Sequence, residues 1–361
     1  MKVKNNVLIP SGGETEFYKQ VADFLLAARQ HAKRQIDNTI VKTYYEIGRM
    51  IVEREQQGEK RAQYGKKLLV GLADYLVANV DKRLSSDNLK LMRRFYIVYS
   101  DSQIGESVIP QFTQNVSWTH YIQLMRIENV NARHFYEIET AQNGWSIRQL
   151  QRQIGSSLYE RLALSRDKDK VMELANAGQV VETAHDIFKS PYVLEFTGLE
   201  ERSEYSESDL EQALIDNLAK FLLELGKGFL FEARQKRFSF DEKSFFVDLV
   251  FYNRLLQCYV IIDLKIDELK HQDLGQMQMY VNYFDRYVKK DFENPTIGIL
   301  LCEEKNDNIV ELTLPKDANI YASAYSLYLP DKALLQRKLS EWVAEFEEAQ
   351  EALGEAKKEG L

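Results

Sequence analysis

The chain has 361 residues, of which 45% are hydrophobic and 28% charged, with a formal net charge of −8. This length allows two domains with separate cores, and the composition is that of an ordinary globular protein. No apolar run is long enough to cross a bilayer, and the first residues lack the apolar stretch of a secretory signal, so we expect a cytosolic protein with no membrane partner. The two cysteines, Cys258 and Cys302, lie in apolar segments and are expected to be buried thiols.

The charge is divided unevenly along the chain. Residues 1–165 contain 23 Lys and Arg against 17 Asp and Glu, whereas residues 166–361 contain 24 against 38. Attraction of a polyanion would therefore come from the first half, because phosphate contacts require cations. The acidic second half suits chemistry that uses metal ions. The alternative is that the two halves only differ in their solvated faces.

Helical periodicity dominates the first third of the chain. Apolar residues recur every three or four positions over residues 16–55, and residues 64–80 are expected to form a second helix. A third helix follows Ser85, and its apolar stripe contains Leu89, Met92 and Tyr96.

The second and third of these helices suit a helix-turn-helix, in which the second helix of the motif enters the major groove of DNA. The candidate DNA-binding residues lie off the apolar stripe and are Asn88, Lys90, Arg93 and Arg94. The alternative is a solvated cationic face that binds nothing.

More helices are expected up to residue 164, with large aromatic side chains that favour core packing over base stacking. We therefore predict an all-α N-terminal domain over residues 14–164, for DNA binding or assembly. Residues 165–190 are expected to be a connector, and Pro191 marks a boundary.

The chain changes character after Pro191. A helix is expected from Ser206 to about Leu225, followed by strands at residues 229–240, 245–252 and 259–266, a helix at 271–287, and strands at 296–302 and 322–329. This order predicts an α/β domain with a mixed sheet over residues 191–330. Residues 331–361 are expected to form an amphipathic C-terminal helix, which packs on its own domain or joins two copies of the chain.

Two aspartates interrupt segments that otherwise read as buried strands. Asp248 and Asp263 would be costly to desolvate without a cation. Because side chains alternate along a strand, Asp263 and Lys265 share a face. Two carboxylates beside an ammonium suit a divalent metal ion and a water. The competing interpretation is that each aspartate is satisfied by backbone donors or by an arginine.

Two helices are expected to add polar groups to these aspartates. Glu211 lies at the edge of the buried face of the helix that opens the domain, and Gln276 lies four residues before Tyr280 on the later helix. The predicted site contains Glu211, Asp248, Asp263, Lys265 and Gln276. These residues suit metal-assisted phosphodiester hydrolysis, with Mg²⁺ or Mn²⁺ held by Asp248 and Asp263.

The combination of Asp248, the triplet Asp263-Leu264-Lys265 and the Gln-x-x-x-Tyr helix resembles the PD-(D/E)XK nuclease superfamily. Longer phrases at residues 191–196, 221–229, 46–49 and 88–95 are similar to the YhcG family of predicted bacterial nucleases. The chain has Asp263 where many relatives have glutamate, and Val247 where a proline often precedes the first acid.

The resemblance implies a restriction-endonuclease-like fold for residues 191–330. It also implies metal ligation by Asp248 and Asp263, a catalytic lysine at Lys265, and supporting roles for Glu211 and Gln276. The expected function is a metal-dependent endonuclease that acts on DNA in recombination, repair or defence against foreign DNA. The alternatives are a non-catalytic DNA-binding or assembly protein that keeps the fold, and a nuclease that acts on RNA.

Overall fold

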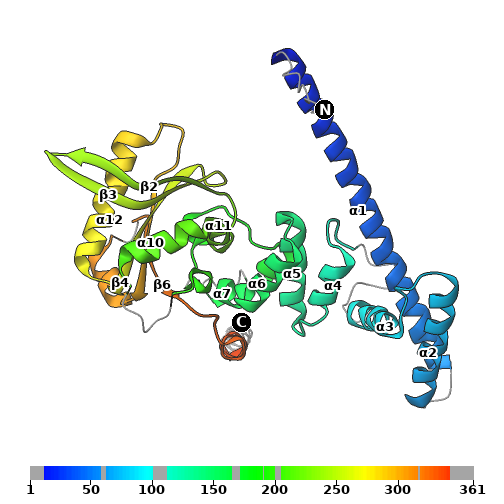
Figure 1. The fold of residues 1–361 in the computed structure, drawn as a ribbon. Helices are drawn as coiled ribbons and strands as arrows, with labels where there is room; N and C mark the ends of the chain where they lie inside the picture. The colour runs from blue at the N-terminus through cyan, green and yellow to red at the C-terminus, as the bar shows by residue number, and fades with distance from the viewer. Residues whose placement is uncertain are drawn as a thin grey trace, which may run out of the picture. The chain divides into compact units, whose positions relative to one another are not determined.

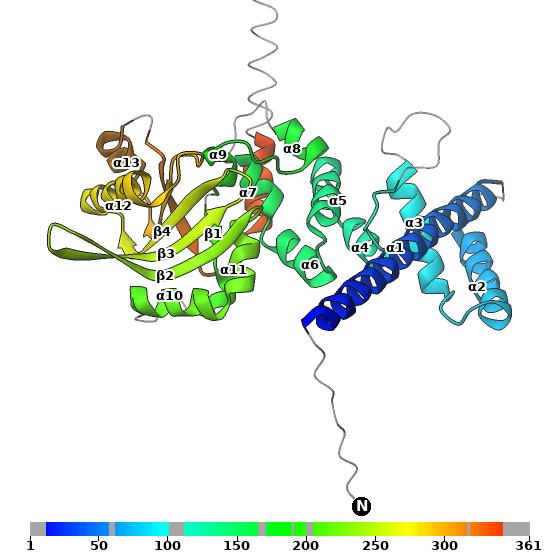
Figure 2. The same cartoon turned by 90° about the horizontal axis from the view of Figure 1, so that it is seen from above.

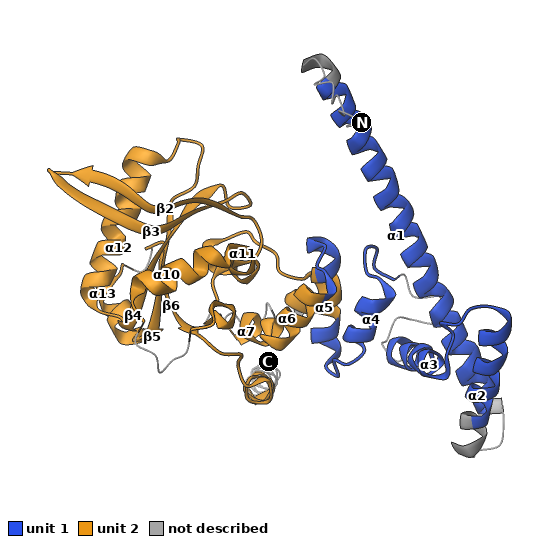
Figure 3. Cartoon of the chain, viewed as in Figure 1, with its two compact units in different colours: residues 1–133, 140–147 blue, residues 134–139, 148–361 orange. Residues whose placement is uncertain are grey.

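The computed structural model describes residues 12–57, 62–100, 112–164, 171–189, 191–199, 205–315 and 318–341 (Figure 1). They divide into two compact units, residues 1–133 with 140–147 and residues 134–139 with 148–361 (Figure 3). No helix in these ranges combines the length and apolar character that a membrane span requires.

The first unit is helical, as predicted. Its helices are α1 (Gly12–Gln57), α2 (Ala62–Asn79), α3 (Ser86–Ser100), α4 (Trp118–Leu124) and part of α5 (Val130–Asn143). Leu89, Met92 and Phe95 of α3 are fully buried, and Leu89 and Met92 pack against Ile51 of α1 and Leu69 of α2. The expected stripe on α3 therefore forms the centre of this unit's core.

The second unit is built on a six-stranded sheet with the order β1-β6-β5-β4-β3-β2. Strand pairs β1/β6, β6/β5 and β5/β4 are parallel, and β4/β3 and β3/β2 are antiparallel, so the predicted mixed sheet is confirmed. The strands are β1 (Tyr192–Val193), β2 (Phe229–Phe240), β3 (Lys243–Asn253), β4 (Cys258–Glu268), β5 (Ile297–Glu304) and β6 (Ile320–Ser326).

Helices cover both faces of this sheet (Figure 2). Leu210 and Phe221, of α10 (Glu207–Asp216) and α11 (Leu218–Leu225), pack with Leu249 and Ile262 on one face. On the other face, Met277 of α12 (His271–Tyr283) packs with Ile261 and Leu300. The remaining elements of the unit are α6 (Ile147–Gly155), α7 (Leu158–Leu164), α8 (Val171–Ala177), α9 (Ala184–Ile187), the 3₁₀-helix Glu195–Thr197, the π-helix Phe284–Val288, and α13 (Asp307–Thr313).

The helix predicted from Ser206 to Leu225 is two helices. Asn217, with φ −112° and ψ 28°, separates α10 from α11, and its side-chain amide donates to the carbonyl of Ala213 at 3.1 Å. An asparagine that bonds its own backbone competes with the helical pattern. Ile215 and Leu218 still pack against the same core, so the break does not change the buried face.

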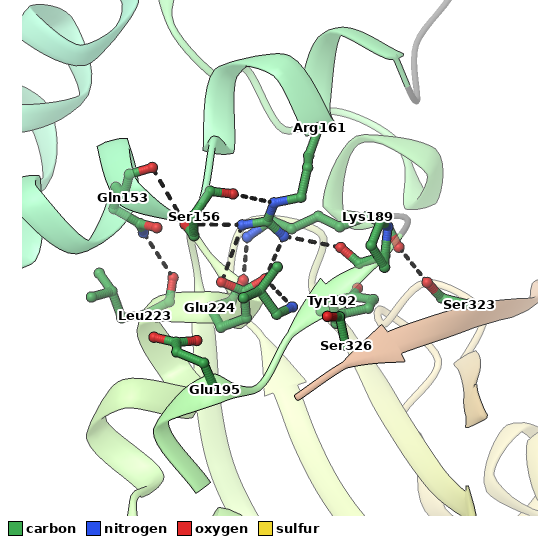
Figure 4. Close-up of polar contacts among 12 residues, drawn as sticks. Gln153, Ser156, Arg161, Lys189, Tyr192, Glu195, Leu223, Glu224, Ser323 and Ser326 are labelled. Carbon is green, nitrogen blue, oxygen red and sulfur yellow. Dashed lines mark hydrogen bonds and ion pairs between the residues drawn. The ribbon is translucent and has the colours of Figure 1, made fainter. Parts of the chain in front are cut away.

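Residues 148–164 belong to the second unit, although the sequence pattern placed them with the N-terminal helices. Arg161 of α7 is fully buried, and its Nη1 donates to Oε1 of Glu224 on α11 at 2.6 Å. Arg152 of α6 lies 3.2 Å from the other oxygen of Glu224, and Lys189 donates to the Glu224 carbonyl (Figure 4). Burial raises the pKa of Glu224, but the charges of Arg161 and Lys189 outweigh it and lower the pKa to about 2. This buried cluster fastens α6 and α7 to the sheet-bearing unit.

The predicted connector and C-terminal helix are seen only in part. Residues 171–177 and 184–187 of the connector form α8 and α9. A helix is present over residues 332–341, where Leu339 is buried, whereas residues 342–361 lie outside the described residues. Both cysteines are buried free thiols, as expected.

Candidate active site

Strands β3 and β4 stop pairing at the two predicted aspartates. Their ladder runs from Asn253 paired with Cys258 to Leu249 paired with Ile262, and the next residues along are Asp248 and Asp263. Beyond this point the Leu264 N–H donates to Oδ2 of Asp248 at 2.9 Å. Asp248 therefore accepts a backbone hydrogen bond where the ladder ends, and this contact keeps its carboxylate beside β4.

Asp263 lies between two residues of one core, Ile262 and Leu264, so its side chain points to the other face of the sheet. It is only 3% exposed. Burial raises its pKa to about 7, with a further contribution from the nearby charge and hydrogen bond of Asp248, although Lys265 opposes the shift. Asp263 therefore has too little positive charge around it to ionise at its ordinary pKa.

Lys265 places an ammonium against this pair. Its Nζ lies 2.9 Å from Oδ2 of Asp263 and 3.6 Å from a carboxylate oxygen of Glu207. Burial alone lowers the pKa of Lys265, but Asp263 and Glu207 raise it above its ordinary value. The ammonium therefore stays protonated at neutral pH and acts as a hydrogen-bond donor and a positive charge.

Glu211 is connected to the site through Gln235, a residue that the sequence pattern does not predict. Its carboxylate, 4% exposed, accepts from Arg234 Nε and from the side-chain amide of Gln235. The same amide donates to Oδ1 of Asp248 at 2.9 Å. Gln235 thus links Glu211 on α10 to Asp248 on β3.

Gln235 has a positive φ of 45° and lies on β2, where Arg234 pairs with Leu249 and Lys236 with Val247. This left-handed backbone is uncommon for a residue other than glycine and costs about 1 kcal/mol or more. The alternation of apolar and polar residues along β2 does not indicate a left-handed residue at this position. The backbone conformation of Gln235 depends on how β2 pairs with β3. Glu207 was not predicted as a site residue either, although it directly follows Ser206, at which the helix was expected to begin.

Gln276 contacts Tyr280 on the same helix. Its amide donates to the Tyr280 hydroxyl, as their four-residue spacing permits. Burial raises the pKa of Tyr280, the Gln276 contact opposes the shift, and the charges of Asp263 and Asp248 raise it further. Gln276 is exposed, whereas Tyr280 is buried and lies within reach of the charges of both carboxylates.

The acidic pair has the chemistry of a hard-cation site. Within the described residues no group of three or more His, Cys, Asp or Glu is arranged as a metal cluster. Mg²⁺ is commonly held by one or two carboxylates together with waters and substrate phosphate oxygens, so Asp248 and Asp263 fit that ion. A cation at this position would also offset the burial that raises the pKa of Asp263.

The predicted DNA-binding residues of α3 have intramolecular partners. Arg93 lies 2.6 Å from Glu55 of α1, and Arg94 donates to the carbonyl of Met125 at 3.0 Å. Lys90, paired with Asp87 at 2.8 Å, has 59% of its side chain exposed. Asn88 donates to the carbonyl of Arg83 in the turn at 3.0 Å. The proposed DNA contact stays a prediction, and the side chain of Lys90 is more exposed than that of Arg93, at 41%.

Comparison with known proteins agrees with this architecture. Residues 185–340 match the family described as the YhcG PDDEXK nuclease domain, and residues 20–161 match the DUF1016 N-terminal domain. "Putative nuclease YhcG" of Escherichia coli (strain K12) is 38% identical over 368 residues, which cover 94% of this chain and 98% of that protein. The chain belongs to the YhcG family.

This family membership confirms the predicted nuclease superfamily and the two-part organisation. The match to DUF1016 ends at residue 161, within α7, whereas the three-dimensional units divide at residue 148. A solved structure described as a repair endonuclease from Pyrococcus abyssi is 19% identical over 36% of this chain and 50% of that chain. Its TM-score of 0.24 is too low to support an inference about function.

Proposed function

We propose that the chain is a metal-dependent endonuclease that hydrolyses phosphodiester bonds of DNA. The observation that carries this proposal is the contact of Lys265 with Asp263, beside Asp248, where β3 and β4 diverge. A hydrolytic site needs a positive charge for the phosphate and a positioned water, and these three residues can provide both with a bound ion.

In this proposal Asp248 and Asp263 hold Mg²⁺ or Mn²⁺, which supplies Lewis acidity and positive charge next to the scissile phosphate when it is bound. Lys265, which stays protonated, donates a hydrogen bond to the attacking water or to a phosphate oxygen. It does not act as the base, because its proton is held by two carboxylates.

Glu211 and Gln235 act through Asp248. Gln235 fixes one oxygen of Asp248 and the Leu264 N–H fixes the other, so the carboxylate is oriented before any ion binds. Each of these oxygens keeps a further lone pair for a cation. Gln276, which is exposed, is proposed to position the substrate, and the hydroxyl of the buried Tyr280 holds its amide.

Closed circular DNA, supplied both as a plasmid duplex and as a single strand, tests this function. With Mg²⁺ or Mn²⁺ the protein is expected to nick or linearise the circle, which has no ends for an exonuclease, and with chelator it is expected to leave it intact. Labelled RNA in competition checks the choice of nucleic acid. Absence of cleavage with every divalent ion, or preferential cleavage of RNA, would contradict the proposal.

A second role, assembly, is favoured by one feature of the helical unit. Every described side chain from residue 15 to residue 36 of α1 is exposed, and several large apolar ones gather on one side of the helix. They include Phe17, Val21, Phe24 and Leu25. An exposed apolar face of this kind marks an interaction surface.

The sequence of this face points to a second copy of the chain as its partner. Residues 15–23 carry two acidic groups and one basic group, whereas residues 24–36 carry three basic groups and no acidic one. Two antiparallel copies would bring the acidic half against the basic half. They would also bring Val21 and Leu25 over the small side chains Ala28 and Ala32. We therefore propose that α1 pairs two copies antiparallel.

A further inference from the structure

A cavity of about 350 Å³ lies between the β2–β3 hairpin and α12. Its lining includes the rings of Phe238, Phe240, Tyr283 and Tyr287, together with Arg286. The Phe238 and Tyr283 rings are stacked, with centroids 4.0 Å apart and planes at 21°. The cavity therefore has aromatic walls contributed by both a strand and a helix.

Two of these rings stay open to solvent. Phe240 is 57% exposed and Tyr287 is 63% exposed. Aromatic faces favour flat, apolar partners, and covering them removes apolar area from water. Their position at the cavity suits a planar ring that enters from outside.

Polar groups on the helix side could fix the edge of such a ring. Gln278 and Asn282 line the cavity, and the amide of Gln278 donates to Oδ1 of Asn282 at 3.3 Å. Side-chain amides can pair with the hydrogen-bonding edge of a nucleobase. The exposed Arg286 adds a positive charge that suits a phosphate.

Tyr280 connects the cavity with the candidate active site. Phe238 at the cavity contacts the Tyr280 ring, with centroids 5.5 Å apart. Tyr280 in turn lies within electrostatic reach of Asp263 and Asp248, and Gly275, next to Gln276, lines the cavity. A nucleic-acid strand whose phosphate lies at the carboxylates would bring a neighbouring base to this cavity.

We propose that the cavity receives an unstacked base adjacent to the cleaved phosphate, so that the substrate is DNA with unpaired nucleotides rather than continuous duplex. The proposal rests on the proposed nuclease function and names its substrate class. A base inside a duplex is stacked on both sides, and moving it out of the stack costs a few kcal/mol. A single strand or a flap offers the base at lower cost, and aromatic stacking then stabilises it.

The test uses the full chain carrying Asp263→Asn, so that binding is measured without cleavage. Oligonucleotides carry 2-aminopurine, a base whose fluorescence falls on stacking, either in an unpaired flap or within a duplex. Phe240→Ala with Tyr287→Ala removes the two exposed rings. The matched control is Phe292→Ala with Leu312→Ala, at positions that are 74% and 88% exposed and do not line the cavity.

We expect the flap to bind with quenched fluorescence. The cavity variant should weaken flap binding by at least about fivefold and relieve the quenching, with duplex affinity unchanged. The control should behave as the parent. Equal losses for flap and duplex, or no loss beyond that of the control, would overturn the proposal.

The same variants in the cleavage-competent chain separate the two proposals. Ring-dependent flap binding without cleavage by any variant would leave the cavity assignment standing and remove the nuclease function. Cleavage that is equal for flap and duplex, and insensitive to the two rings, would remove the cavity assignment alone.

Discussion

The Lys265 ammonium lies 2.9 Å from Oδ2 of Asp263, in a strand where the two residues share one face. Replacing Lys265 with Met removes the counter-charge that opposes the raised pKa of Asp263. We expect cleavage to fall by at least about a hundredfold, as when one transition-state donor is lost. We also expect the Asp263 pKa to rise above about 7.

The control is Lys220→Met, which removes an exposed lysine of α11. It should cleave as the parent does. Retained cleavage by Lys265→Met would exclude a chemical role for this lysine.

The second prediction concerns pH in the metal-free protein. Because the pKa of Asp263 is raised to about 7 in the folded chain, the folded state holds a proton that the unfolded state releases near pH 4. This contribution to stability is complete below about pH 4 and is lost as pH rises through about 7. The neutral Asp263→Asn variant should therefore be more stable than the parent at pH 8, by about 1 kcal/mol or more, and similar to it at pH 4.

Chemical unfolding in chelator at several pH values measures this difference. Asp216→Asn, at an exposed carboxylate of α10, serves as the control. The same stability difference between parent and Asp263→Asn at pH 4 and pH 8 would contradict the shifted titration.

The third prediction concerns the buried cluster in Figure 4. Arg161→Met leaves Glu224 without its 2.6 Å partner in a fully buried site. Breaking such a pair costs about 3–5 kcal/mol. Urea unfolding should show this loss in the sheet-bearing unit, whereas Arg337→Met, in a pair exposed by 68% and 65%, should change little. A loss below about 1 kcal/mol would mean that α7 is not held by this pair.

The fourth prediction tests the α1 surface. Val21→Glu with Leu25→Glu places charges on the exposed apolar face and should convert the proposed dimer to a monomer in light scattering. Leu312→Glu, at another exposed leucine, should leave the mass unchanged. A monomeric parent protein would refute pairing through α1, and a dimer that survives the double change would place the contact elsewhere.

The fifth prediction separates DNA contact from folding in α3. Lys90→Ala should weaken DNA binding and reduce the slope of log affinity against log salt by about 0.9, if this cation contacts one phosphate. Arg93 and Arg94 are less clean probes, because they bond Glu55 and the Met125 carbonyl. Lys19→Ala on α1 is the control. An unchanged salt slope for Lys90→Ala would favour the assembly role of this unit.

Much of this architecture follows from local pattern. Three features could be predicted because the spacing of apolar residues along the chain coincides with their burial. They are the apolar stripe with Leu89 and Met92, the buried strands around Asp248 and Asp263, and the shared face of Asp263 and Lys265. The break at Asn217 was not predicted, since the apolar pattern continues through it. The bridge made by Gln235 depends on backbone geometry set by strand pairing, to which the sequence gives no local signal. The link from Arg161 to Glu224 spans 63 positions and arises only in the folded chain.

The central claim is that Asp248 and Asp263 together hold the ion needed for cleavage. Its most direct measurement is the single-turnover cleavage rate of a circular single-stranded DNA by the parent, Asp248→Asn and Asp263→Asn with Mg²⁺. We predict that each substitution lowers the cleavage rate by at least about a hundredfold while the protein stays folded and binds DNA. Cleavage by either variant at the parent's rate would contradict it.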